Sequence, residues 1–182
     1  MSDCKAVLDA CVLVNACLRD TLLRLAEEPR LYVPLWSAEI LEETARTLRG
    51  PNFGLAGIQV DRLMGRLQSA FPEAIIEGYE HLIGEALNHP GDRHVLAAAA
   101  KAGANRIVTF NVRHFLPSAV DAVGITVQKP DDFLIDAYRL APELVVEKLH
   151  RQAEAIHATV EHIVGRLELA APGFARLIGP SL

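Results

Sequence analysis

Short apolar runs alternate with helix-periodic segments along most of the chain, and this alternation restricts the possible folds more than any other feature. Residues 89–111 show the unit most clearly, with a helix through residues 95–100, a glycine stop at Gly103 and a buried strand at residues 106–110. Strands that alternate with helices predict a mostly parallel sheet covered on both faces. We therefore expect an α/β fold with a central sheet.

The other elements follow from the same periodicity. Pro34 is expected to close the second strand, and Ser37 is the expected N-cap of the helix that follows it. The other expected strands lie at residues 6–8, 31–33, 74–76 and 124–127. The other expected helices lie at residues 22–26, 37–48, 60–71, 82–87 and 131–138.

Size and composition favour one folded domain in the cytoplasm. The 182 residues are 51% hydrophobic and 23% charged, which supports one substantial core. No stretch approaches the ~20 apolar residues of a membrane span, and the first residues lack the layout of a signal peptide. Cys4, Cys11 and Cys17 lack CxxC spacing, so we expect reduced thiols rather than disulfides or a zinc site. A net charge of −5 argues against broad binding to duplex nucleic acid.

Several polar side chains are expected at one rim of the sheet. Asp9 and Asn111 each follow a predicted strand, and ligands of parallel sheets bind beyond the carboxyl ends of the strands. Asp92 opens the alanine-rich helix, and Glu43 borders the apolar stripe of the Ser37 helix, whereas Glu42 points further out. If the acids converge, they form an all-oxygen cluster suited to Mg²⁺ or Mn²⁺.

Each of these residues also has a purely structural interpretation. Asp92 after a glycine is an ordinary helix N-cap, and Asp9 could hydrogen-bond the turn after its strand. Glu43 could be a solvent-facing charge balanced by Arg46, and Asn111 is a common turn residue. Only the combination of all four favours a functional site.

The order of four segments adds a family resemblance. From about Lys5 to Leu134 the chain resembles a PIN domain, most closely the VapC-like toxin ribonucleases of toxin–antitoxin pairs. The resemblance rests on VLDACVLVNACLRD, LYVPLWSAEILEETARTL, HPGDRHVLAAAAKAGANRIVTFNVRHF and VQKPDDFL. It implies a three-layer α/β/α sandwich, a divalent-metal-dependent endoribonuclease activity and a cognate antitoxin protein as partner.

The resemblance also implies roles for individual residues. The metal ligands for Mg²⁺ or Mn²⁺ fall on Asp9, Glu43 and Asp92, with Glu42 as a near alternative to Glu43. Asn111 completes the catalytic group, at a position where related chains carry Asp or Asn. The bound metal would polarise a phosphate oxygen and activate a water for attack on phosphorus.

Two positions depart from the family pattern. Cys11 stands where many relatives have Asn, and His114 stands where many have Asp. The missing carboxylate lowers the negative charge of the pocket, so a second metal ion should bind more weakly. A PIN module that binds RNA or a protein partner without cleaving RNA is therefore the alternative function.

The roles expected of the other basic side chains rest on their location or on exclusion. Without an HExxH motif, we expect His89, His94 and His114 to be surface or hydrogen-bonded histidines rather than metal ligands. The candidates for contact with the phosphates of single-stranded RNA are Arg93, Lys101, Arg106 and Arg113.

The C-terminal segment predicts a helical extension. We expect a PIN-like nuclease domain at residues 1–138 and an amphipathic extension at residues 139–182, packed on the same domain or in an interface. Apolar residues recur at helical spacing from Pro142 to Ala171, which predicts one long helix. Such a helix could also pair with a second copy, so a homodimer is expected. The three histidines of this segment should be solvated: His150, His157 and His162.

Overall fold

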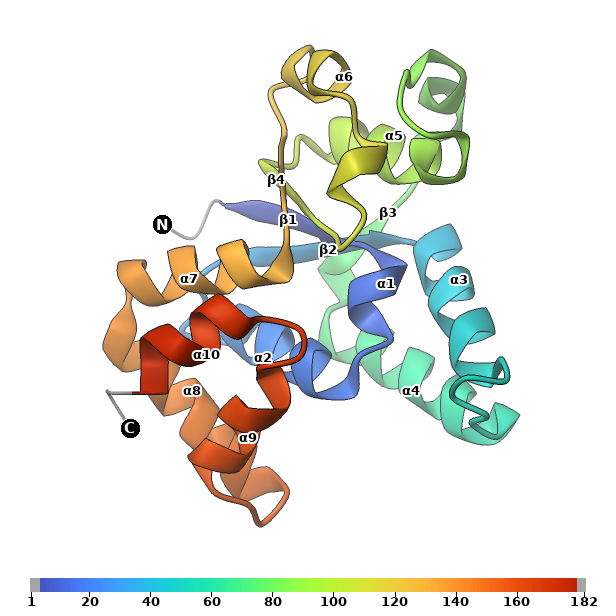
Figure 1. Ribbon diagram of the computed structural model, residues 1–182. Helices are drawn as coiled ribbons and strands as arrows, with labels where there is room; N and C mark the ends of the chain where they lie inside the picture. The colour runs from blue at the N-terminus through green and yellow to red at the C-terminus, as the bar shows by residue number, and fades with distance from the viewer. Residues whose placement is uncertain (1–3, 180–182) are drawn as a thin grey trace.

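A computed structural model describes residues 4–179 and contains a five-stranded, all-parallel sheet (Figure 1). The strands lie in the order β3-β2-β1-β4-β5, so the first strand is central. The expected mostly parallel sheet is confirmed. The strand bounds are β1 (Lys5–Leu8), β2 (Val33–Ser37), β3 (Ile75–Ile76), β4 (Arg106–Val108) and β5 (Thr126–Gln128).

Helices cover both faces of the sheet, as expected for an α/β/α sandwich. One layer holds α5, which contacts β1 to β4, and the other holds α2 and α7 with the C-terminal helices outside them (Figure 1). The α-helices are α1 (Ala10–Leu13), α2 (Ala16–Ala26), α3 (Ala38–Arg49), α4 (Gly57–Ala70), α5 (Arg93–Ala102), α6 (Pro117–Asp121), α7 (Pro130–Leu140), α8 (Pro142–Ala155), α9 (Val160–Leu167) and α10 (Pro172–Ile178). The 3-10 helices are η1 (Pro72–Ala74), η2 (Glu80–Glu85), η3 (Pro90–Asp92) and η4 (Val112–His114).

The alanine run of α5 sits directly on the sheet. Ala97, Ala98 and Ala99 are buried, and their small side chains let the helix backbone approach the strands closely. Gly103 ends the helix at a φ of 59°, the left-handed conformation that glycine adopts without steric cost. This predicted helix-and-stop unit is confirmed, and it leads directly into β4.

Ser37 starts α3 as predicted, but the strand before it is longer than expected. The Ser37 hydroxyl accepts a hydrogen bond from the Ile40 N–H at 3.2 Å. Pro34 was expected to end a strand at residues 31–33, yet β2 begins only at Val33 and continues through Pro34 to Ser37. The Val33 N–H donates toward β1, so the nitrogen of the next residue faces the other side, where β3 pairs only from Trp36 onward. Proline is tolerated there because no ladder hydrogen bond is lost.

The helix expected at residues 82–87 is a 3-10 helix that ends at Glu85. Gly84 lies within it and Pro90 follows shortly afterwards, and both residues oppose a regular α-helix. Leu87, which lies in the expected helix range, is outside η2 and 68% exposed. The prediction of an α-helix was wrong because Gly84 and Pro90 oppose it more strongly than the apolar spacing favours it.

The prediction of one long C-terminal helix was also wrong, because the segment forms the three helices α8, α9 and α10. The chain leaves α8 at His157, whose φ of 54° is left-handed, and the Thr159 hydroxyl then caps α9 by accepting from the His162 N–H at 3.3 Å. The predicted apolar positions are nevertheless buried, including Leu149, Ile163 and Leu167. Helix α8 packs on α2 and α7, and α10 packs on α7.

The histidines of the C-terminal segment and the cysteines are found in the states expected of them. His150, His157 and His162 are exposed, as predicted. Cys4, Cys11 and Cys17 are free thiols, and Cys17 is buried. Among residues 4–179, no helix combines the length and the apolar character needed to cross a lipid bilayer.

Candidate functional site

The site begins at the carboxyl ends of β1 and β4. The Asp9 N–H donates to the carbonyl of Val108 at 3.1 Å, which fixes Asp9 between these two strands. Strands β2 and β3 extend the sheet on one side of β1, while β4 and β5 extend it on the other. In parallel sheets, ligands bind at the crevice where the strand order changes direction. The predicted position of Asp9 at this rim is confirmed.

The Asp9 carboxylate is held by two neighbouring side chains. Asp9 is only 4% exposed, and its Oδ2 accepts hydrogen bonds from the Thr109 hydroxyl at 2.6 Å and from the Cys11 thiol at 3.1 Å. Burial, and then the charge of Asp9, raise the pKa of the Cys11 thiol to about 12. Cys11 is therefore a protonated donor to Asp9 and a poor nucleophile.

Thr109 was missed by the sequence analysis, although it connects two predicted site residues. It is fully buried, and its hydroxyl also accepts the Asn111 N–H at 3.0 Å. The sequence signal was a single hydroxyl residue in the apolar run that leads into Asn111. A buried hydroxyl needs hydrogen-bond partners, and here the partners are the site itself.

The structure brings Glu43, rather than Glu42, close to Asp9. Glu43 is half-buried on α3, whereas Glu42 is exposed and lines a groove with Arg46 and Arg49. Burial raises the pKa of the Glu43 carboxyl above its usual range, and the Asp9 charge raises it further. His94 and Arg46 lower this pKa without cancelling the effect of burial. Glu43 and Asp9 therefore form a pair of neighbouring acids.

His94 lies beside this pair, in a position that the sequence analysis did not predict. It is 5% exposed, and its ring lies between two acids of α3, with Nε2 3.5 Å from Glu43 Oε2 and Nδ1 3.7 Å from Glu39 Oε2. Among the described residues, neither ring nitrogen has a hydrogen-bond partner. The expectation of a surface or hydrogen-bonded histidine was wrong here, because α5 buries this side chain against α3.

Asp92 makes its contacts with two histidines. It lies at the start of α5, but its side chain forms no capping hydrogen bond. Its Oδ2 lies 2.9 Å from His114 Nδ1 and 3.3 Å from His89 Nδ1, and the two rings stack with centroids 4.6 Å apart. The site thus has two parts, Asp9 with Glu43 and Asp92 with the histidines. Asn111 connects them along the chain, because its N–H donates to the Thr109 hydroxyl and its carbonyl accepts the His114 N–H at 2.8 Å.

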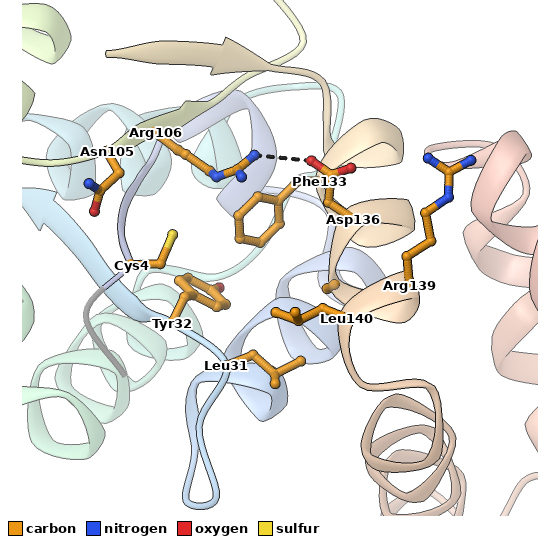
Figure 2. A pocket seen from close by; sticks show the side chains of 10 residues that line it. Cys4, Leu31, Tyr32, Asn105, Arg106, Phe133, Asp136, Arg139 and Leu140 are labelled. Carbon is orange, nitrogen blue, oxygen red and sulfur yellow. Dashed lines mark hydrogen bonds and ion pairs between the residues drawn. The ribbon is translucent and has the colours of Figure 1, made fainter. Parts of the chain in front are cut away.

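Two of the four candidate basic residues lie away from this rim. Arg106, at the start of β4, forms an ion pair with Asp136 at 3.1 Å (Figure 2). Lys101, at the end of α5, lines a hollow with Lys5 and Arg30. Arg93 directly follows Asp92 in the sequence. Arg113 directly precedes His114 and is exposed.

Comparison with known families decides the classification. The sequence profile described as PIN domain matches residues 5–113. The chain belongs to the PIN domain family. This PIN domain protein is also similar to a protein of Mycobacterium tuberculosis (strain ATCC 25618 / H37Rv) named "Putative ribonuclease VapC50", with 47% identity over 66 residues. That alignment covers 36% of this chain and 39% of the length of the relative. No solved structure matches the chain.

The donor set of this PIN domain suits a divalent cation. Asp9 and Glu43 offer carboxylate oxygens, the ligands that Mg²⁺ and Mn²⁺ prefer. Asp9 is buried and Glu43 is half-buried, and burial together with the Asp9 charge raises the pKa of Glu43. A bound cation would relieve both the repulsion and the loss of solvation.

Proposed function

We propose that this PIN domain protein is a divalent-metal-dependent endoribonuclease that hydrolyses phosphodiester bonds of RNA. The observation that carries the proposal is the pair Asp9 and Glu43 at the switch point of the sheet, where burial and mutual repulsion raise the pKa of Glu43. Such a pair is unfavourable without a cation and favourable with one. The name of the similar M. tuberculosis protein, a ribonuclease, supports RNA as the substrate.

Asp9, Glu43 and Asp92 would hold Mg²⁺ or Mn²⁺. When bound, the ion supplies a Lewis acid for the phosphate and lowers the pKa of a bound water. The hydrogen bonds from Thr109 and Cys11 fix the orientation of the Asp9 carboxylate before the ion binds. Such donors to a ligating carboxylate raise the precision of a metal site.

The neighbouring polar residues would position the RNA. Asn111 follows β4 at the same rim, and its half-buried amide can donate to a phosphate oxygen. Arg113 is exposed next to it and can pair with a second phosphate. The chain thus offers an amide and a cation where a single RNA strand would cross the rim.

We also propose that the protein acts in the cytoplasm as the toxin of a type II toxin–antitoxin pair, restrained by a cognate antitoxin. The resemblance to VapC-like proteins supports the antitoxin, and three free thiols fit a reducing compartment. In this proposal residues 1–138 carry the nuclease, and residues 139–182 form an extension. The packing of α8 and α10 on α7 supports an extension that covers the same domain. A homodimer remains part of the proposal.

One observation favours a second function, a PIN module that binds RNA or protein without cleavage. Asp92 pairs with His114 and His89, whereas Asp9 and Glu43 lie together without it. A site whose third acid is already occupied could bind a ligand yet fail to cleave it.

Cleavage of a mixed pool of labelled single-stranded and structured RNAs tests the proposal. Purified protein is assayed with Mg²⁺, with Mn²⁺ and with chelator, beside Asp9→Asn and Asp92→Asn. Asp136→Asn is the control, because this acid lies at the other end of the sheet. We expect metal-dependent cleavage that falls at least about 100-fold in both site variants and persists in the control. Protein that binds RNA but cleaves nothing with either metal would support the binding module instead.

A further inference from the structure

The group His89, Asp92 and His114 has the geometry of a metal site of its own. One ligand atom from each residue lies within 4.8 Å of the others. The two nitrogen–oxygen distances, 2.9 and 3.3 Å, are close to the spacing of neighbouring ligands around one ion. For a tetrahedral ion with bonds of about 2.0–2.1 Å, that spacing is about 3.3 Å.

The backbone holds these three residues in register before any ion binds. The His89 N–H donates to the His114 carbonyl at 2.9 Å, and the Asp92 N–H donates to the His89 carbonyl at 2.9 Å. The main chains of all three ligands are therefore joined directly, although His114 is far from the others in sequence. Because the site is preformed, the binding of a ligand costs little further conformational entropy.

Nδ1 of His89 lies between the backbone and the Asp92 carboxylate. It accepts the Gly91 N–H at 3.3 Å and lies 3.3 Å from Asp92 Oδ2. A nitrogen and an oxygen that can both ligate a metal therefore stand side by side at the surface of the group. A metal ion could take both atoms as neighbouring ligands.

We propose that His89, Asp92 and His114 bind a transition-metal ion of the Zn²⁺ class. Two imidazoles and one carboxylate suit Zn²⁺, Co²⁺ or Ni²⁺, whereas Mg²⁺ prefers an all-oxygen set. The His89 side chain is 56% exposed, so solvent reaches the group and can supply a fourth ligand. The site shares Asp92 with the proposed nuclease centre, but its ability to bind metal does not depend on RNA cleavage.

Titration of the metal-free full chain with Co²⁺ and Zn²⁺ tests the site without any RNA. Co²⁺ absorption in the visible range reports ligation, and displacement by Zn²⁺ in competition with a chelating dye gives the affinity. We expect one bound ion, no displacement by equimolar Mg²⁺, and affinity lowered at least about 100-fold in His89→Ala and His114→Ala. His162→Ala, which removes an exposed histidine of α9, should bind like the wild type.

Two controls keep the outcome interpretable. Because His89 is exposed, His89→Ala should retain the wild-type circular dichroism and melting temperature, so its loss of metal reflects a lost ligand. His114→Asp should shift the preference from Zn²⁺ toward Mn²⁺ and Mg²⁺, because it restores an oxygen donor. Zn²⁺ affinity that is unchanged in both alanine variants, or that is lost only in Asp9→Asn, would overturn the proposal.

The result is separable from that of the nuclease assay. Zn²⁺ bound at the histidines by a protein that cleaves no RNA would leave this site standing and remove the proposed function. Mg²⁺-dependent cleavage by a protein whose histidine variants bind Zn²⁺ normally would do the reverse.

Discussion

The two ends of the sheet neutralise their charged side chains in different ways. Beyond the amino ends of the strands, a hollow of about 770 Å³ is lined by residues that precede β1, β2 and β4 and by α7 (Figure 2). There Arg106 pairs with Asp136, and Gln128 donates to the same carboxylate oxygen at 2.8 Å. The protein itself supplies the positive charge at this end.

At the carboxyl ends, the protein brings acids together and does not fully compensate them. Asp9 adds to the effect of burial on Glu43, and the opposing influence of His94 and Arg46 leaves the pKa of Glu43 raised. This hollow and the incompletely compensated acids therefore lie at opposite ends of the sheet. Charge balance, rather than concavity, distinguishes the candidate site in this fold.

Added Mg²⁺ or Mn²⁺ should stabilise the protein through the carboxyl end alone. An ion at 100 times its Kd contributes about 2.7 kcal/mol to the free energy of unfolding. For a domain of this size, the melting temperature should rise by roughly 5–10 °C. Asp9→Asn should lose most of the shift and Asp136→Asn should keep it, as measured by calorimetry against a chelator baseline. An equal shift of the melting temperature in both variants would show that the metal does not act at the carboxyl end of the sheet.

Removal of the Thr109 hydroxyl should cost more than a surface change, because it leaves buried groups unpaired. Thr109→Val removes a donor to Asp9 and an acceptor for the Asn111 N–H. We expect the free energy of unfolding in urea to fall by about 1–3 kcal/mol. Thr109→Ser, which keeps the hydroxyl, should stay close to the wild type, and an equal loss in both variants would point to packing instead.

Neutralising one acid at each end should have opposite effects on the metal-free protein at pH 7.5. Glu43→Gln removes an unfavourable charge and should stabilise the fold, while Asp136→Asn breaks an ion pair and should destabilise it. Both changes should stay below about 1 kcal/mol, because solvent screens these partly exposed carboxyls. Urea unfolding measures both, and the same sign for the two variants would contradict the comparison.

The raised pKa of Glu43 should also appear, as a smaller effect, in the pH dependence of stability. Because the folded-state pKa of Glu43 is raised above its ordinary value of 4.5, the folded protein binds more protons than the unfolded chain between those two values. This stabilising contribution is full below pH 4.5 and is lost as the pH rises through the raised pKa. Glu43→Gln should remove this part of the slope, which unfolding curves across that range would reveal.

The sequence predicted those parts of the fold and site that depend on local order along the chain. A buried strand followed by Asp9, and another followed by Asn111, had to end at the same rim once the sheet was parallel. Glu43 was favoured over Glu42, which stayed an alternative, because only Glu43 borders the apolar stripe of α3. These predictions needed only periodicity and the direction of the strands.

What the sequence did not reveal depends on contacts between distant segments. Thr109, His94 and the pairing of His114 with Asp92 become visible only when β4, η4, α3 and α5 are assembled. The helix break at His157 was missed because apolar spacing continues across it while the backbone turns. Periodicity alone could not show that the apolar residues before and after His157 belong to two separate helices.

The short outer strands have a consequence for self-association. Strand β3 has two residues and β5 has three, so neither edge offers a neighbouring chain more than a few unpaired backbone groups. Edges this short protect a protein from growth by strand addition, both as ordered dimers and as aggregates. Two copies of this chain would therefore have to meet through helical surfaces, and their sheets would remain separate.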